Sequence, residues 1–284
     1  MTCCNSRRKP EWLKIKLPKG QSSTEVLNIV RKHNLHTICT SGMCPNQGEC
    51  WGNRTATFMI GGDVCTRSCK FCNVKTGRPA PLDPAEPENI ANSVKLLGLK
   101  HAVITSVDRD DLADLGAAHW VKVIEAVKRV NPGTTMEVLI PDFQGRRELV
   151  QQVIDARPEV ISHNLETVRE LSDGVRSRAK YDISLQVIRQ VSESGIVSKS
   201  GIMLGLGETR EQILQTMDDL LAVGCKVMTI GQYLQPSEAN LEVKEYVTPE
   251  TFQEYERIGL EKGFRYVESG PLVRSSYHAE KHVR

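Results

Sequence analysis

Short runs of apolar and β-branched residues alternate along this chain with longer stretches in which apolar residues recur every three or four positions. The short runs are typical of buried strands and the longer stretches of amphipathic helices. In one such stretch, Trp120, Val123, Ile124 and Val127 fall on one helical face. Six strand candidates begin, in chain order, at Thr57, Ala102, Met136, Val160, Ser200 and Val227.

This alternation predicts an α/β fold in which parallel strands are joined by helical crossovers. Six strand–helix units fit an open, partial TIM-type barrel better than a closed barrel of about eight units, and we place it at residues 57–263. Residues 1–56 form an N-terminal extension, and residues 264–284 form a C-terminal extension that begins with one more extended element. We expect the two extensions to meet over the open side of the barrel.

Polar residues follow several of the predicted strands. Ser106 ends one strand candidate, and Asn164 and Glu166 come directly after another. In barrels of this type the loops that follow the strands build the active site. The sequence therefore predicts the site at the carboxyl ends of the strands.

Six of the nine cysteines stand in two groups of unequal spacing. The first triplet is Cys39, Cys44 and Cys50, and the second triplet is Cys65, Cys69 and Cys72. Thiolates are the ligands that iron–sulfur clusters use, and three thiolates leave one iron of a four-iron cluster without a cysteine. Two triplets therefore predict two clusters with different tasks, one of which has a coordination site for a small molecule. Of the other cysteines, Cys225 is expected to be a small buried apolar residue, and Cys3 and Cys4 have no assigned role.

Two other interpretations of the second triplet remain open. Its spacing also puts three cysteines on one face of a helix, although Gly61 and Gly62 before it and Arg67 and Lys70 within it favour a loop. Zinc is the other alternative, with His36 or His101 completing a site. Structural zinc sites normally have four ligands in paired motifs, so the spacing favours iron–sulfur clusters.

The overall charge of +2 is too small to indicate a nucleic-acid-binding or membrane-surface protein, and neither partner is expected. The first residues lack an apolar signal core, and no apolar run of about 18 residues occurs. Clustered cysteines at short spacing favour a reducing compartment. We therefore predict a cytoplasmic protein.

The second triplet resembles the C-x3-C-x2-C motif of the radical S-adenosylmethionine superfamily. Together with the first triplet and the run Arg274-Ser275-Ser276-Tyr277, the chain resembles the lipoyl synthases within that superfamily. The matching motifs span nearly the whole chain: Cys44–Trp51, Gly62–Arg67, Thr105–Asp111, Ile140–Phe143, His163–Thr167, Gly201–Glu208, Gly231–Ser237 and Gly270–His278.

The resemblance implies two 4Fe–4S clusters and S-adenosylmethionine as cosubstrate. Cys65, Cys69 and Cys72 hold the cluster that binds adenosylmethionine, and the first triplet holds an auxiliary cluster with a serine as fourth ligand. Successive side chains of an extended segment face opposite ways, so Ser275 and Ser276 cannot both reach one iron if that segment is extended. We choose Ser276, which immediately precedes the tyrosine.

The resemblance also places Ser106, Asn164, Glu166 and Arg176 near the polar groups of adenosylmethionine. Its implied reaction is the insertion of two sulfur atoms at C6 and C8 of an octanoyl group on a carrier-protein lysine, with sulfur taken from the auxiliary cluster. The implied partners are octanoylated lipoyl domains of 2-oxoacid dehydrogenases or the glycine cleavage H protein, and a reductant such as ferredoxin or flavodoxin.

Rival interpretations are a radical sulfur-inserting enzyme acting on a free small molecule, as in biotin formation, a ferredoxin-type electron carrier, and a zinc-stabilised binding module. The chain departs from the usual family pattern at Ser177-Arg178 and at Ala239–Val243. Both departures are expected to lie away from the cluster ligands and to bear on carrier preference.

Overall fold

The computed structural model describes residues 9–14, 21–33, 35–52 and 56–283, with the backbone alone for residues 21–23. Cys3 and Cys4 lie outside the described residues. None of the helices within the described ranges combines the length and apolar character needed to cross a membrane.

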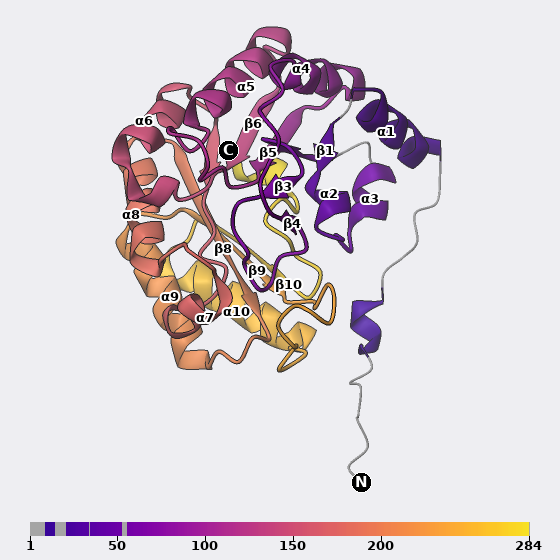
Figure 1. Ribbon diagram of the computed structural model, residues 1–284. Coiled ribbons are helices and arrows are strands. Elements are labelled where there is room, and N and C mark those ends of the chain that lie inside the picture. The colour runs from indigo at the N-terminus through magenta and orange to yellow at the C-terminus, as the bar shows by residue number, and fades with distance from the viewer. Residues whose placement is uncertain (1–8, 15–20, 34, 53–55, 284) are drawn as a thin grey trace.

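A single large sheet forms the centre of the molecule (Figure 1). Its strands are β1 (His36–Thr37), β2 (Thr57–Ile60), β5 (His101–Ser106), β6 (Thr135–Leu139), β7 (Val160–Ser162), β8 (Val197–Leu204), β9 (Val227–Gln232) and β10 (Tyr266–Gly270). The spatial order is β1-β2-β5-β6-β7-β8-β9-β10, and every neighbouring pair is parallel except β1 with β2.

The prediction of an open, partial barrel is confirmed. The six predicted strands correspond to β2 and β5 to β9, and the extended element expected near the C-terminus is β10. The two edge strands, β1 and β10, are not paired with each other, so the barrel is not closed. The right-handed twist of parallel strands curves such a sheet without requiring closure.

Helices cover the outer face of the sheet (Figure 1). They are α4 (Glu86–Leu97), α5 (Ala117–Val130), α6 (Arg147–Asp155), α7 (Arg169–Val175), α8 (Tyr181–Glu193), α9 (Arg210–Ala222) and α10 (Pro249–Lys262). Helix α5 buries Trp120, Val123, Ile124 and Val127 as its periodicity predicts. Helix α9 begins with a capping box between Thr209 and Gln212, which satisfies amide groups at its first turn.

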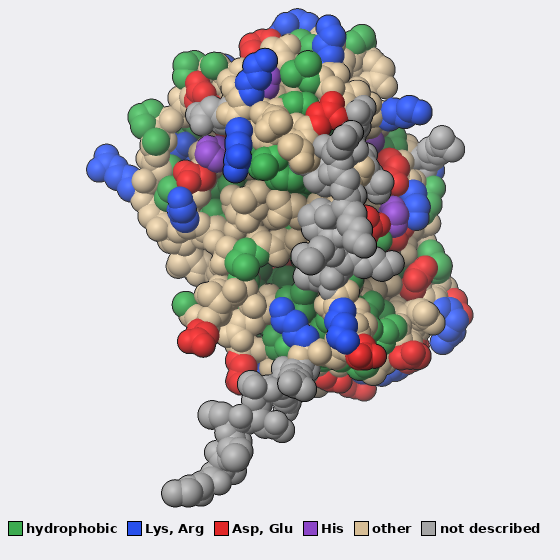
Figure 2. Space-filling model, turned by 90° about the vertical axis from the view of Figure 1, so that its right-hand side faces the viewer, with side chains coloured by type: hydrophobic (Ala, Val, Ile, Leu, Met, Phe, Trp, Pro, Cys, Tyr) green, Lys and Arg blue, Asp and Glu red, His purple; other side chains and the backbone are tan. Residues whose placement is uncertain are grey.

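The remaining elements are η1 (Glu11–Leu13), α1 (Gln21–Lys32), α2 (Ile38–Ser41), α3 (Gln47–Gly52), β3 (Val64–Cys65), β4 (Lys75–Thr76), η2 (Phe143–Gly145) and η3 (Ala279–Val283). On the face drawn in Figure 2, Lys and Arg side chains are interspersed with Asp and Glu, so the net charge of +2 is not gathered there into one basic patch.

The two extensions meet, as expected. The side-chain amide of Asn46, which precedes α3, donates to the carbonyl oxygen of Leu272 at 2.7 Å, and these residues are 226 positions apart. The C-terminal segment then continues to η3, which contacts β5 and β6 and ends inside the ring of strands and helices (Figure 1).

A buried ion pair anchors the end of the chain. The Lys199 ammonium lies 2.8 Å from a Glu137 carboxylate oxygen, and both side chains are almost fully buried. Lys199 also lies 3.3 Å from Nδ1 of His282, which burial and the Lys199 charge hold largely neutral by lowering its pKa to about 3. The C-terminal segment is therefore fixed at both ends, near Asn46 and at Lys199.

Candidate active site

A cavity of about 490 Å³ opens at the carboxyl ends of the strands, where the sequence predicts the site. Its lining includes seven of the predicted site residues: Cys65, Cys69, Cys72, Ser106, Asn164, Glu166 and Arg176. Ser275 lines it as well, whereas the predicted Ser276 does not belong to the lining. The cavity is therefore shared by the second triplet, three residues at or just after strand ends, Arg176 after α7, and the C-terminal extension.

The second triplet lies in a loop, not on a helix, which settles one of the open alternatives. Strands β3 and β4 pair at the base of this loop, with Cys65 opposite Thr76. Backbone amides already face two of the sulfurs: those of Arg67 and Asp108 each lie 3.4 Å from Cys65 Sγ, and that of Val74 lies 3.5 Å from Cys72 Sγ. Amide donors of this kind stabilise thiolates that bind iron, so the donor set fits an iron–sulfur cluster.

Both buried thiols are difficult to ionise without a cation. Burial, reinforced by the Asp108 carboxylate, raises the pKa of Cys65 to about 12. Burial, reinforced by neighbouring Cys69, raises the pKa of Cys72 to about 11. A bound metal displaces these protons because it offsets the thiolate charge, so metal binding at this loop releases protons.

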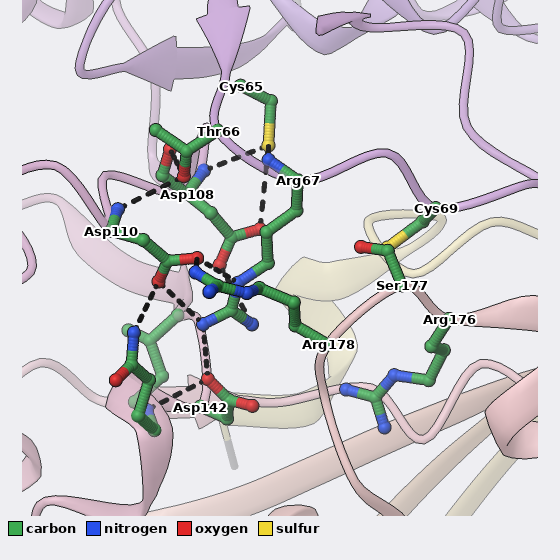
Figure 3. A network of polar contacts seen from close by, with 12 residues as sticks. Cys65, Thr66, Arg67, Cys69, Asp108, Asp110, Asp142, Arg176, Ser177 and Arg178 are labelled. Carbon is green, nitrogen blue, oxygen red and sulfur yellow. Dashed lines mark hydrogen bonds and ion pairs between the residues drawn. The ribbon is translucent and has the colours of Figure 1, made fainter. Parts of the chain in front are cut away.

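Arg67, between the first two cysteines of the loop, is held by three carboxylates (Figure 3). Its guanidinium lies 2.8 Å from Asp110, 2.8 Å from Asp142 and 3.3 Å from Asp108. Burial disfavours the Arg67 charge, but the carboxylates outweigh it and hold the pKa of Arg67 above its ordinary value. Burial likewise opposes the charge on Asp110, yet the bonds from Arg67 lower the pKa of Asp110 to about 2.

This cluster ties the cysteine loop to the loops after β5 and β6. Sequence reasoning did not assign a role to Arg67 or its partners, although the run Asp108-Arg109-Asp110-Asp111 is a visible signal of charge pairing. Their separation in the sequence hid the pairing: Arg67 and Asp142 are 75 positions apart.

The opposite wall of the cavity offers polar groups that lack a full set of protein partners. Arg176 is 7 % exposed, and its side-chain hydrogen-bond partners among the described residues are Ser184 Oγ at 2.8 Å and the Leu165 carbonyl at 3.4 Å, neither of which is a carboxylate. The side-chain oxygen of Asn164 is buried and has no hydrogen-bond partner among the described residues. Burial raises the pKa of the neighbouring Glu166, and the Arg176 charge opposes that shift.

These groups match a zwitterionic ligand. A buried guanidinium that pairs with no carboxylate among the described residues suits a ligand carboxylate, and the Asn164 carbonyl and Glu166 carboxylate oxygens can accept from a ligand amino group. Ser106 ends β5 on the same cavity. The structure thus brings together all four residues that the resemblance assigned to adenosylmethionine.

Two cysteines of the first triplet lie on short helices and the third lies between them, and the C-terminal extension approaches this triplet. Cys39 belongs to α2, Cys50 belongs to α3, and the backbone amide of Cys44 donates to the Cys39 carbonyl at 3.0 Å. Burial lowers the pKa of Arg274, and the Cys44 sulfur opposes that shift electrostatically.

The Tyr277 side chain lies close enough to the same triplet for Cys50 to shift the pKa of its hydroxyl. Burial raises the pKa of Tyr277, and the nearby Glu49 and Cys50 raise it further. Arg274 and Tyr277 therefore flank the first triplet, with Ser275 and Ser276 between them.

The segment that carries these serines is a turn and not an extended strand. The Tyr277 amide donates to the Arg274 carbonyl at 2.9 Å, which closes the turn. The alternation of side chains along an extended segment therefore does not apply here. Ser275 lines the cavity, and the choice of Ser276 as the cluster ligand depends on the resemblance alone.

A glycine that the sequence analysis did not single out permits this arrangement. A Cβ on Gly231 would lie 2.2 Å from the carbonyl oxygen of Val273, so only glycine lets the C-terminal extension approach β9 this closely. Gly201 is comparable, since a Cβ there would lie 2.3 Å from Thr229 Oγ1.

The prediction that both sequence departures lie away from the cysteine ligands is wrong. Ser177 Oγ lies 3.6 Å from Cys69 Sγ, and the Asn240 side-chain amide donates to the Cys72 carbonyl at 3.0 Å. The loop after α7 and the loop after β9 both fold back over the second triplet, which the linear sequence does not reveal. Cys225 is 1 % exposed, as its predicted apolar role requires.

Among the residues that the structure describes, no three His, Cys, Asp or Glu side chains converge in a way that could hold a single metal ion. Three cysteines of a four-iron cluster bind three different irons, so their sulfurs are not required to converge on one point.

The chain matches the model of the radical SAM superfamily over residues 59–220. It is 70% identical to a lipoyl synthase of Treponema denticola, with 100% of this chain and 97% of that protein aligned. It is 64% identical to a lipoyl synthase of Parabacteroides distasonis, with 97% and 98% aligned.

Solved structures share the fold at low sequence identity. Methylornithine synthase superposes with a TM-score of 0.59 at 14% identity, covering 88% of this chain and 75% of that one. Streptococcus suis SuiB bound to S-adenosylmethionine superposes with a TM-score of 0.60 at 12% identity, covering 86% of this chain and 53% of that one. The family match, the full-length relatives and the cavity geometry agree, and the chain belongs to the lipoyl synthase family of the radical SAM superfamily.

Proposed function

We propose that this enzyme inserts two sulfur atoms, at C6 and C8, into an octanoyl group attached to a carrier-protein lysine. The observation that carries this proposal is the 70% identity to a lipoyl synthase, because it extends over 100% of this chain and so includes both extensions. A ferredoxin-type carrier or a zinc-stabilised module does not agree with membership of this family. The rival function is sulfur insertion into a free small molecule, and the peptide incubation described below distinguishes the two.

We assign the radical chemistry to the second triplet. Cys65, Cys69 and Cys72 hold a 4Fe–4S cluster, and the iron without a cysteine is left for adenosylmethionine. When bound, this cluster supplies the electron that cleaves adenosylmethionine to the radical that removes hydrogen from an unactivated methylene. The proposal is supported by the backbone amides directed at two of the three sulfurs.

The chain's own residues bind and orient the cosubstrate in this proposal. Arg176 pairs with the methionine carboxylate, and this role is supported by its partners within the described residues, which are a carbonyl and a hydroxyl and not a carboxylate. Asn164 and Glu166 accept from the amino group, and Ser106 contacts the polar groups from the end of β5. Apolar cavity residues such as Met59 and Ile140 exclude water from the reacting carbon.

We assign the sulfur supply to the two extensions. Cys39, Cys44 and Cys50 hold the auxiliary cluster, and Ser276 completes its ligands. Serine oxygen is a harder and poorer partner for iron than thiolate. When bound there, the auxiliary cluster would supply the inserted sulfur atoms, and the weak serine bond would make the iron held by Ser276 the most easily lost. Residues 1–56 and 264–284 then form the sulfur-donating part, and residues 57–263 form the radical-generating part.

The substrate is an octanoylated protein, and a reductant supplies electrons. We propose the lipoyl domains of 2-oxoacid dehydrogenases or the glycine cleavage H protein as carriers, and ferredoxin or flavodoxin as reductant. A cytoplasmic location is part of the proposal because clustered free thiols persist in reducing compartments.

The reaction is tested by anaerobic incubation of the cluster-loaded enzyme with adenosylmethionine, a reductant and an octanoyl-lysine peptide. Mass spectrometry should detect deoxyadenosine and the peptide with two added sulfur atoms. Sulfur insertion into a free small molecule, with none into the peptide, would overturn the proposal.

The serine assignment is tested by Ser276→Ala, with Ser275→Ala as the matched control one residue away. The S276A enzyme should cleave adenosylmethionine at close to the normal rate and form little dithiolated peptide. The S275A enzyme should retain sulfur insertion. Full product from S276A would remove Ser276 from the auxiliary site.

A further inference from the structure

The loop of the second triplet is bonded along its length to the segment that follows α7. The Lys70 amide donates to the Val175 carbonyl at 2.9 Å, and the Ser68 amide donates to Ser177 Oγ at 3.2 Å. Arg178 then pairs with Asp110 at 3.2 Å, the carboxylate that also binds Arg67. This series of bonds fixes where Ser177 lies relative to the cysteines (Figure 3).

The hydroxyl of Ser177 has a defined direction. A serine hydroxyl has one proton to donate and two lone pairs that accept. Because the Ser68 amide occupies a lone pair of Ser177 Oγ, the proton is left free to face the other neighbour, Cys69 Sγ, at 3.6 Å. A cysteine that binds iron is a thiolate and can only accept, so the hydroxyl is the donor whenever a cluster is present.

We propose that the Ser177 hydroxyl donates a hydrogen bond to the Cys69 sulfur and thereby raises the reduction potential of the radical SAM cluster. Hydrogen bonds to cluster sulfurs are among the factors that set this potential. Reduction adds a negative charge that spreads onto the sulfurs, and a donor stabilises that charge. Ser177 is a positioning residue, and the inference rests on the proposed assignment of Cys69 as a cluster ligand.

The anchoring of the segment distinguishes this contact from an incidental one. Arg176 is buried and bonded to Ser184, and Arg178 is bonded to Asp110, so both neighbours of Ser177 are fixed. The Asn240 amide, from the other sequence departure, holds the same loop by donating to the carbonyl oxygen of Cys72. The second triplet thus has a side-chain donor at Cys69 in addition to the backbone donors at Cys65 and Cys72.

The test is a potentiometric titration of the full-length, cluster-loaded enzyme monitored by electron paramagnetic resonance. The relevant signal is the one that changes when adenosylmethionine is added. Ser177→Ala should shift the midpoint potential of that signal to a more negative value, and Ser177→Thr, which keeps the hydroxyl, should restore the wild-type value. Ser68→Ala is the matched control, because it removes an exposed hydroxyl beside the same cysteine and keeps the amide.

An S177A midpoint equal to that of the wild type, or an equal shift in S68A, overturns the role of Ser177. Cys69→Ala separates this outcome from failure of the proposed function. Loss of the adenosylmethionine-sensitive signal in C69A upholds the ligand assignment, and its persistence means that the assignment itself is wrong.

Discussion

The two cysteine triplets are built in different ways. The second lies in a loop closed by β3 and β4, fixed by the Arg67 carboxylate cluster and covered by the segment after α7. The first has two cysteines on short helices and one between them, and it lies beside a turn from the opposite end of the chain. The family model spans residues 59–220 and so includes only the second.

This difference indicates that the second triplet is held within the barrel, whereas the surroundings of the first triplet are built from both ends of the chain. The loop of the second triplet is fixed by buried charges within the region that matches the superfamily model. The first triplet and the Arg274–Tyr277 turn come together only when both chain ends dock on the barrel.

The largest effect should come from removing the charge that fixes the second loop. Arg67→Met leaves Asp110 and Asp142 buried without their partner, and breaking a buried ion pair in this way costs about 3–5 kcal/mol of unfolding free energy. Urea denaturation measures the loss. Arg257→Met, which breaks an exposed helical pair with Glu261, should cost less than about 1 kcal/mol. Equal losses in the two variants would mean that the Arg67 cluster does not fix the loop.

A smaller effect should come from displacing the C-terminal extension. Gly231→Ala puts a Cβ 2.2 Å from the Val273 carbonyl oxygen, so the extension must shift, at a cost of about 1–3 kcal/mol typical of overpacking. The G231A enzyme should still cleave adenosylmethionine while forming less dithiolated product. Gly133→Ala, where a Cβ meets nothing within 4 Å, is the control and should leave both activities unchanged. If G231A lost adenosylmethionine cleavage and sulfur insertion to the same extent, the barrel and the C-terminal extension would not have separate roles.

The smallest effect concerns how stability depends on pH through His163, a buried histidine that lines the same cavity as the second triplet. His163 is bonded to the Ile140 carbonyl and to Ser184, and burial, helped by the Arg176 charge, lowers its pKa from 6.5 to about 4. The unfolded chain therefore takes up a proton below pH 6.5 that the folded chain does not, so stability falls as pH falls between 6.5 and 4.

For His163 this amounts to a loss of about 1 kcal/mol between pH 6.5 and 5.5. Urea titrations of the wild type and His163→Gln at the two pH values isolate the contribution, because the glutamine does not titrate. A wild-type pH dependence that H163Q reproduces in full would assign the effect to other groups, such as His101 and His282.

The sequence by itself determined the barrel and the chemistry. Periodic apolar positions located the six central strands, since burial on both faces requires apolar runs. The glycines before the second triplet and the polar residues within it distinguished a loop from an ordinary core helix. The strand-end positions of Ser106, Asn164 and Glu166 placed them at the cavity because parallel strands present their carboxyl ends together.

Only the tertiary structure decided the contacts between distant loops. The carboxylate partners of Arg67, the Val273 carbonyl against Gly231 and the Ser177 hydroxyl beside Cys69 all depend on how the loops after different strands fold over one another. Hydrophobic periodicity encodes which face of an element is buried. It does not encode which polar side chains meet, because hydrogen bonds and ion pairs form over a few ångströms between residues whose separation in the sequence is arbitrary.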